Sequence, residues 1–246
     1  MHIKKSRRSF EQPAAMRQSG FTLVEIAIVL VIIGLLLGGI LKGQEMITQA
    51  KIKNIVNDFN GITAAINSYQ DRYKALPGDD LNAATRWTGQ GALAGNGDGQ
   101  WNKAAAAATA PEVYNNVPGA AAAAGTPEVN LFWWHLRLAG FVGGTTAAAD
   151  ISSIAPPGNA ANGIMGVQTS GMGFTSNIIC SSNLPDKIAI AVDTQMDDGT
   201  STSGQVRANY EASANPAIHA LNAAAPPGGD NYVESGTNQY LLCKNL

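Results

Sequence analysis

The chain has 246 residues and a formal net charge of −2, and charged residues make up only 14% of it. From Phe21 onward, 11 basic residues stand against 17 acidic ones, a net charge of −6, which argues against the basic face that nucleic-acid binding requires. This length suffices for one or two domains beyond a membrane segment, and the neutral polar composition is typical of exported proteins.

Residues 1–20 are basic and polar, with Glu11 as the single acid among five basic residues: Lys4, Lys5, Arg7, Arg8 and Arg17. An ordinary secretory signal places its cleavage site after the apolar stretch, whereas here the small residue Gly20 precedes it. Cleavage after Gly20 would remove the basic leader and leave the apolar segment on the mature protein. The positive-inside rule keeps the leader in the cytoplasm and sends the rest of the chain outside.

The apolar run from Phe21 to Leu41 contains one charged residue, Glu25. As a helix this run is about 30 Å long, enough to cross the core of a bilayer. A carboxylate inside a membrane is costly unless another group pairs with it, so Glu25 is a candidate functional residue. The alternative is that Glu25 only complements the dipole of its own helix, which contributes about 0.3–1 kcal/mol.

The segment Gly20-Phe21-Thr22-Leu23-Val24-Glu25 and the apolar run behind it resemble the N-terminal signature of type IV prepilins and type II secretion pseudopilins. The resemblance implies that a membrane-embedded prepilin peptidase cuts between Gly20 and Phe21 and methylates the new N-terminus at Phe21. It also implies that Glu25 pairs with the Phe21 amine of a neighbouring subunit and sets the axial register of a filament.

The resemblance further implies an α+β, pilin-like fold, in which a long N-terminal helix packs against a head that contains a small antiparallel sheet. The expected partners are other pilin subunits in a homopolymer or mixed filament, the prepilin peptidase, an inner-membrane assembly platform and, before assembly, membrane lipid. The head is expected in the periplasm before assembly, and the finished filament is expected to be an extracellular pilus or a periplasmic pseudopilus.

The helical pattern continues over residues 42–76 and becomes amphipathic. Apolar residues recur there at spacings of three and four, which predicts one buried stripe: Ile52, Ile55, Val56, Phe59, Ile62, Ile66, Tyr69 and Tyr73. Pro77-Gly78 is the first strong stop, so one helix is expected from about Thr22 to Lys74. Many family members have a proline where this chain has Lys42, and nearby glycines either loosen the helix or permit close packing: Gly34, Gly38, Gly39 and Gly43.

The head, residues 77–246, opens with two aspartates, and a short helix is expected from Asp80 to Trp87. Gly95-Asn96-Gly97-Asp98-Gly99 resembles the core of a calcium loop, although the EF-hand pattern fails because its first and twelfth positions are Ala94 and Ala105. A structural calcium site of another type would use Asp79, Asp80, Asn96 and Asp98. The alternative is an ordinary turn with a solvated Asp98. No cofactor is required by either reading.

An alanine-rich, low-complexity excursion covers residues 104–125, where two alanine runs are candidates for short helices. Thr126-Pro127-Glu128 then signals the start of a helix that extends to about Ala139. Its expected buried face consists of Leu131, Trp134, Leu138 and Phe141. His135, on the same helix, reads as a packed or exposed residue rather than a metal ligand.

From Gly143 to Gly173 only short, irregular strands are expected. The strand candidates beyond it are Phe174–Cys180, Lys187–Val192, Gln205–Tyr210 and a final edge strand, Tyr240–Cys243. The segment from Asp193 to Gly199 reads as a turn that brings together Asp193, Asp197 and Asp198. This is a second possible cation site, with a solvated Asp-Gly turn as the alternative.

Two cysteines, Cys180 and Cys243, suggest one disulfide in an exported chain, with two buried thiols as the alternative. The pilin resemblance implies that this pair cross-links the C-terminal region.

The residues contain no set of nucleophile, base and orienting group, so no enzymatic activity is expected. Three functions remain: a type IV pilus subunit, a type II secretion pseudopilin, and a single-pass anchored binding protein that does not polymerise.

Overall fold

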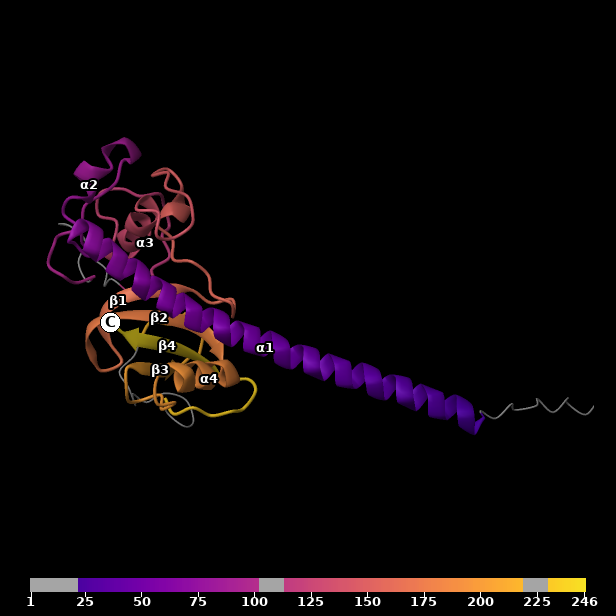
Figure 1. Cartoon of the computed structure of the whole chain (residues 1–246). Coiled ribbons are helices and arrows are strands. Elements are labelled where there is room, and N and C mark those ends of the chain that lie inside the picture. Colours follow the sequence, from indigo (N-terminus) through magenta and orange to yellow (C-terminus); the bar gives the residue numbers. More distant parts are fainter. Residues whose placement is uncertain (1–21, 102–112, 219–229) are drawn as a thin grey trace, which may run out of the picture. The chain divides into compact units, whose positions relative to one another are not determined.

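The computed structural model describes residues 22–101, 113–218 and 230–246 (Figure 1). The chain divides into two compact units, one up to Met46 and one from Ile47 onward. The helix α1 (Leu23–Tyr73) runs through both units. The described residues do not include the basic leader, which ends at Gly20, or Phe21. They also do not include residues 102–112, which contain the first part of the alanine-rich excursion.

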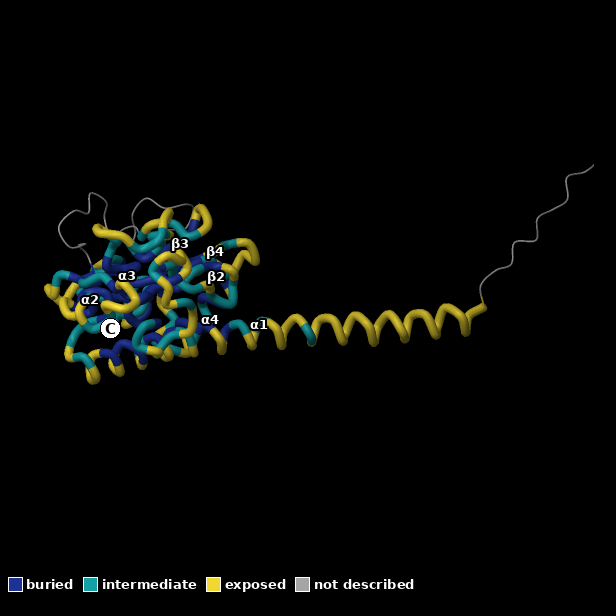
Figure 2. The backbone as a smooth tube through the Cα atoms, turned by 90° about the horizontal axis from the view of Figure 1, so that it is seen from above, coloured by how far each residue is buried: buried dark blue, intermediate teal, exposed yellow. Residues whose placement is uncertain are grey.

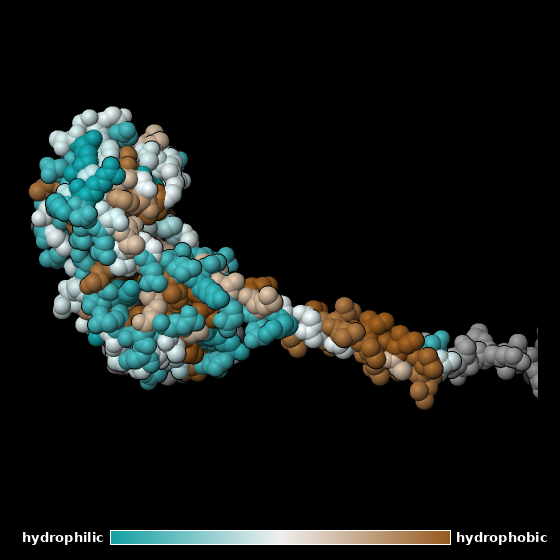
Figure 3. Space-filling view, viewed as in Figure 1, coloured by the Kyte–Doolittle hydropathy of each residue, from teal (hydrophilic) through white to brown (hydrophobic). Residues whose placement is uncertain are grey.

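The described part of the first unit is the apolar half of α1. All its residues are exposed except Gly43, which is half-buried (Figure 2), and Figure 3 shows the hydrophobic surface that they form. Among the described residues, α1 is the one helix that is long and apolar enough to cross a membrane. A helix that is apolar on every side has to be surrounded by lipid or by other protein.

In the second unit α1 is amphipathic, as the sequence predicts. One stripe of the helix is buried, at spacings of three and four residues: Ile52, Ile55, Phe59, Ile62, Ala65, Ile66 and Tyr69. Val56 and Tyr73 are partly buried beside the stripe. The helix ends at Tyr73 because Lys74 adopts a left-handed conformation (φ 54°), and Pro77 follows.

Four antiparallel strands form one sheet in the order β1-β2-β4-β3, and α1 lies over one of its faces (Figure 1). The strands are β1 (Met165–Gly171), β2 (Phe174–Pro185), β3 (Val206–Tyr210) and β4 (Gln239–Asn245). The prediction of Tyr240–Cys243 as an edge strand is wrong, because β4 lies between β2 and β3. Its consecutive residues Tyr240–Cys243 are all buried, as expected of a strand that is covered on both faces.

The two faces of the sheet belong to two hydrophobic clusters. Ile179 and Leu242 belong to the main core, together with residues of α1, of α3 (Glu128–Leu138) and of α4 (Asp186–Met196). Their strand neighbours Cys180 and Cys243 belong to a second cluster that includes Tyr114 and Phe174. The alternation along each strand therefore assigns the cysteines to the face opposite α1.

The prediction of a strand at Lys187–Val192 is wrong, because these residues form part of α4. The isoleucines alternate as in a strand, but the buried set Ile188, Ala189, Val192 and Asp193 follows a helical spacing. Pro185 precedes the helix, and the Asp186 carboxylate in its first turn accepts backbone N–H groups of Ser235 and Gly236. Consequently Asp193–Met196, expected as a turn, is the end of α4.

The remaining elements differ from expectation mainly in their bounds. In place of a helix from Asp80 to Trp87 there are α2 (Ala83–Arg86) and a 3₁₀ turn, Thr88–Gln90; a second 3₁₀ turn is Ile151–Ser153. β2 starts where predicted but continues five residues further, to Pro185, and β1 is a seven-residue strand, with a register shift between Thr169 and Gly171, in the region where only short strands were expected. The alanines at 120–124 are not helical, because so short a run between Gly119 and Gly125 cannot sustain a helix.

Candidate functional site

The start of α1 is a capping box built from Thr22 and Glu25. Glu25 Oε2 accepts hydrogen bonds from the backbone N–H (2.7 Å) and the hydroxyl (2.8 Å) of Thr22, and the N–H of Glu25 donates to Thr22 Oγ1 at 3.2 Å. The pattern Thr-x-x-Glu before an apolar run is the sequence signal of this arrangement, which was not among the predictions for Glu25. Both bonds to the carboxylate use Oε2, and no described residue donates a hydrogen bond to Oε1.

Asp79 organises the glycine-rich loop that follows α2. Its carboxylate accepts the backbone N–H groups of Gly97, Asp98 and Gly99. Burial raises the pKa of Asp79, although these hydrogen bonds act in the opposite direction. The loop is therefore held by backbone donors that surround one carboxylate.

Asp80, predicted as a ligand in the same set, belongs to a different network. It pairs with the Arg86 guanidinium and accepts a hydrogen bond from the Tyr69 hydroxyl at 2.7 Å. Burial by itself would raise the pKa of Asp80, but the hydrogen bonds from Arg86 and Tyr69 hold it below its usual range. Asp80 thus connects α1 to α2.

The acidic group that the structure does bring together consists of Asp79, Asp98 and Glu128, with one carboxylate oxygen of each within 4.8 Å of the others. Glu128, in the first turn of α3, also accepts the backbone N–H of Asn96 at 2.8 Å. From the sequence, Glu128 was expected only to complement the helix dipole, because nothing in the sequence places α3 next to the glycine-rich loop. These oxygen donors are of the kind that calcium prefers.

The second acidic group, Asp193, Asp197 and Asp198, also comes together within 4.8 Å. Each of these carboxylates already accepts a hydrogen bond from a residue of the second unit. Asp193 accepts the Tyr232 hydroxyl at 2.7 Å, Asp197 accepts the backbone N–H of Val206 at 2.9 Å, and Asp198 accepts that of Thr200 at 2.7 Å. Burial raises the pKa of Asp193, against the effect of the Tyr232 hydrogen bond.

His135 is fully buried in α3, and both of its ring nitrogens are bonded to backbone groups. Its Nδ1 accepts the backbone N–H of Gly78 at 2.9 Å, so Nε2 carries the proton and donates to the carbonyl of Leu93 at 2.8 Å. Burial lowers the pKa of His135 to about 4. His2 and His219 lie outside the described residues.

Cys180 and Cys243 form a disulfide between the adjacent strands β2 and β4. The two residues are direct partners in the register of the sheet, with their Cα atoms 4.0 Å apart. Both side chains are fully buried. The cross-link closes a sequence separation of 63 residues.

Comparison with known proteins identifies the N-terminal segment. Residues 15–41 match the prokaryotic N-terminal methylation motif, the prepilin-type cleavage and methylation segment of type IV pilins and pseudopilins. The matched range contains Gly20, Phe21 and Glu25. The chain has no significant match among curated proteins or among solved structures.

Proposed function

We propose that this chain, a protein of the type IV pilin and pseudopilin class by its methylation segment, is a structural subunit of a type IV pilus-like filament. It enters the inner membrane as a prepilin, a prepilin peptidase cuts between Gly20 and Phe21, and Phe21 is methylated. An inner-membrane assembly platform then inserts α1 among the helices of other pilin subunits. The observation that carries the proposal is the carboxylate of Glu25, which lies within the methylation segment at the start of the apolar half of α1.

The capping geometry supports an intersubunit role for Glu25. The bonds from Thr22 use Oε2, and no described residue donates a hydrogen bond to Oε1, which can therefore accept a donor from another subunit. In the proposed filament that donor is the Phe21 amine of a neighbouring subunit, which stays cationic after methylation. Burying this cation and the carboxylate as a pair costs far less than burying either one by itself.

Three substitutions separate the cap from the assembly contact. Glu25→Gln keeps an oxygen that can accept the Thr22 hydrogen bonds but removes the charge. Glu25→Ala removes both functions, and Thr22→Ala removes only the hydroxyl that serves the cap. We expect both Glu25 variants to stay in the membrane and fail to enter filaments, while Thr22→Ala assembles. The measurement is the amount of subunit in sheared filaments and in membranes, and normal filament yield from Glu25→Gln would reject the role.

The proposed location follows from the basic leader and the apolar helix. The apolar helix and the methylation segment fit insertion in a membrane, and leader residues such as Lys4 and Arg7 favour the cytoplasm. The second unit then lies in the periplasm before assembly, where a disulfide between Cys180 and Cys243 persists.

Two other functions are distinguished by direct observation. A pseudopilin of type II secretion would carry the same N-terminal processing but act in a short periplasmic filament, so imaging of sheared surface filaments and mass spectrometry of their subunits decide between the two. A single-pass anchored binding protein would retain Met1 in cells that contain prepilin peptidase. N-terminal sequencing of the purified protein, with Phe21 expected first, tests that reading.

A structural calcium ion is a separate proposal for the group formed by Asp79, Asp98 and Glu128, with Asp193, Asp197 and Asp198 as the second candidate. Titration of the full chain with calcium in detergent should raise its melting temperature if an ion binds. Asp98→Asn and Asp198→Asn, both exposed, assign the effect to one group. No shift at millimolar calcium would remove this proposal.

A further inference from the structure

Asp58 on α1 differs from the buried carboxylates of the second unit. Each of those accepts at least one hydrogen bond: Asp79, Asp80, Glu128, Asp186, Asp193, Glu211 and Asp230. Asp58 is half-buried, and its carboxylate forms no hydrogen bond or ion pair with any residue in the described ranges. Burial alone, with no opposing donor, raises the pKa of its carboxyl group.

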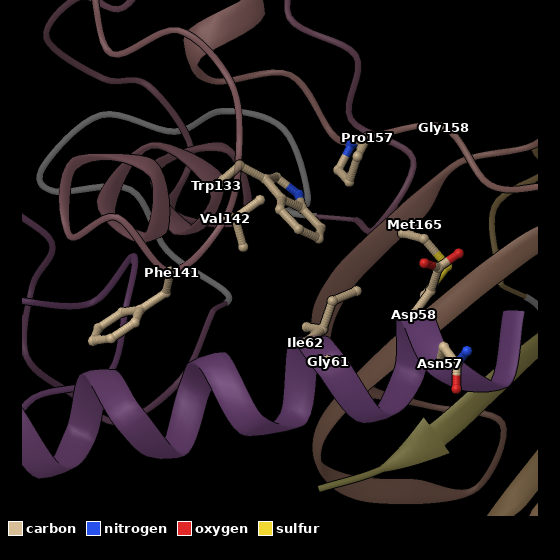
Figure 4. A pocket seen from close by; sticks show the side chains of 10 residues that line it. All are labelled: Asn57, Asp58, Gly61, Ile62, Trp133, Phe141, Val142, Pro157, Gly158 and Met165. Atoms are coloured by element: carbon tan, nitrogen blue, oxygen red, sulfur yellow. The ribbon is translucent and has the colours of Figure 1, made fainter. Parts of the chain in front are cut away.

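Asp58 lies at the edge of an open pocket of about 290 Å³ (Figure 4). Apart from Asp58, Asn57 and two glycines, the lining is apolar: Ile62, Trp133, Phe141, Val142, Pro157 and Met165. These residues come from α1, from α3 and the segment after it, and from β1 and the segment that leads into it. The pocket therefore combines one carboxylate with apolar walls.

This combination suits a cationic group on an apolar stem. The volume is at the lower end of the range of ligand pockets, about 300–1,000 Å³, so it suits one side chain better than a large cofactor. A lysine places its methylene stem against apolar surface and its ammonium near a charge or solvent. An opposite charge next to Asp58 would also favour the ionised form of the carboxylate.

Among the described residues, some lysine side chains have no partner within the chain, whereas every arginine side chain has one. The guanidinium of each described arginine interacts with an aromatic ring, a carboxylate or a backbone carbonyl of the same chain: Arg72, Arg86, Arg137 and Arg207. Three lysines have side chains that form no ion pair or hydrogen bond with any described residue: Lys51, Lys53 and Lys244. A second copy of the chain therefore carries unpaired ammonium groups, which could supply the positive charge that Asp58 lacks.

We propose that the pocket lined by Asp58, Trp133 and Met165 receives a lysine side chain of a second copy of this chain, Lys51, Lys53 or Lys244, and that its ammonium pairs with the Asp58 carboxylate. The inference rests on the proposed function, because a filament brings copies together. It adds a contact in the second unit to the expected contact at Glu25.

The test uses two variants of the full chain that are produced together, so that both are present in the same membrane. The first version keeps Asp58 and carries Lys51→Arg, Lys53→Arg and Lys244→Arg; the second carries Asp58→Asn and keeps the three lysines. A carbodiimide couples a carboxylate to an amine but not to a guanidinium, so a link between Asp58 and one of these lysines can form only between copies. We expect mass spectrometry to find that link, and its absence from both membranes and filaments overturns the proposal.

Single variants measure the consequence for assembly. Asp58→Asn should lower filament yield about tenfold, the factor that about 1.4 kcal/mol gives, while Asp58→Glu keeps most of the yield. The control is Asp71→Asn, which removes the same charge from an exposed position on α1 that is paired with its own Lys74. Asp58→Asn should not lower the melting temperature of the full chain in detergent, and a loss there would identify a role within one subunit and reject the proposal.

The two proposals can fail separately. Wild-type chains that give no filaments but do give the Asp58 link in membranes contradict polymerisation and support the pocket. Normal filaments from Asp58→Asn without any Asp58 link contradict the pocket and leave the filament function standing.

Discussion

Nδ1 of His135 accepts the backbone N–H of Gly78 across 57 residues of sequence, at 2.9 Å. The other ring nitrogen donates to the carbonyl of Leu93, so one side chain satisfies backbone groups at both ends of the segment that contains α2. This role requires the neutral ring, because a protonated imidazole has no acceptor for the Gly78 N–H.

Replacement of His135 by Phe should destabilise the second unit and change its pH dependence. The ring is kept, but two backbone groups lose their partner, at about 1–3 kcal/mol each. The pKa of His135 is lowered from 6.5 to about 4 in the folded state, so its contribution is complete above pH 6.5 and is lost as the pH falls toward 4. Thermal unfolding of the wild type and the variant between pH 4 and 8 should show the difference in stability narrowing at acid pH.

Glu211 should give the opposite pH dependence. This residue is 5% exposed, and the pKa of its carboxyl group is raised by burial from 4.5 to about 7, although the N–H of Asn183 donates to both oxygens. As the pH rises, Glu211 loses its proton in the unfolded chain before it does so in the folded protein. Its contribution to the free energy of unfolding is therefore complete below pH 4.5 and declines as the pH rises to about 7. We expect Glu211→Gln to be more stable than the wild type above pH 7, by at most about 3 kcal/mol.

The control for this measurement is Glu234→Gln, which changes the same charge at an exposed side chain near Lys187. It should leave the slope of stability against pH unchanged between pH 4.5 and 7. An equal slope in the wild type and Glu211→Gln would contradict the role assigned to Glu211.

Removal of the disulfide should weaken the sheet. The double variant Cys180→Ala and Cys243→Ala opens a loop with a sequence separation of 63 residues, and we expect a loss of about 2–5 kcal/mol. Chemical denaturation under oxidising conditions measures it. Under reducing conditions the wild type should approach the variant, and a persistent gap would assign the loss to packing instead.

Gly95 is a position where a methyl group has no room. A Cβ there would lie 2.4 Å from the Cα of Asp79 and from the carbonyl oxygen of Gly78. Gly95→Ala should therefore displace the glycine-rich loop and lower stability by at least about 1–3 kcal/mol. Gly119→Ala is the matched control, because a Cβ there meets nothing within 4 Å, and the melting temperatures of the two variants should differ clearly.

The sequence predicted correctly the elements that are marked by a long hydrophobic pattern or by a start signal within a few neighbouring residues. The apolar stripe of α1 fixes both the helix and its buried face, and Thr126-Pro127-Glu128 marks the start of α3 within one residue. The prediction failed at α4, because six residues with alternating isoleucines satisfy the strand and helix periods equally well. Only the packing of Ala189 and Asp193 decides between them.

Sites depend on contacts between distant segments, and so they were predicted only in part. The carboxylates of Asp79 and Asp98 do meet, but their third neighbour is Glu128, and Asp80 instead binds Arg86. Neither choice can be made without knowing that α3 packs beside the loop. The pocket at Asp58 could not be predicted for the same reason, since its walls come from three separate parts of the chain.

The position of β4 within the sheet has a kinetic consequence. β4 follows the other described strands in the chain and yet pairs with both β2 and β3. During synthesis, which proceeds from the N-terminus, β1 and β2 can form a hairpin early, but β3 has no partner until residues 239–245 have emerged. The second unit should therefore remain incomplete until late in synthesis, after its last strand has emerged.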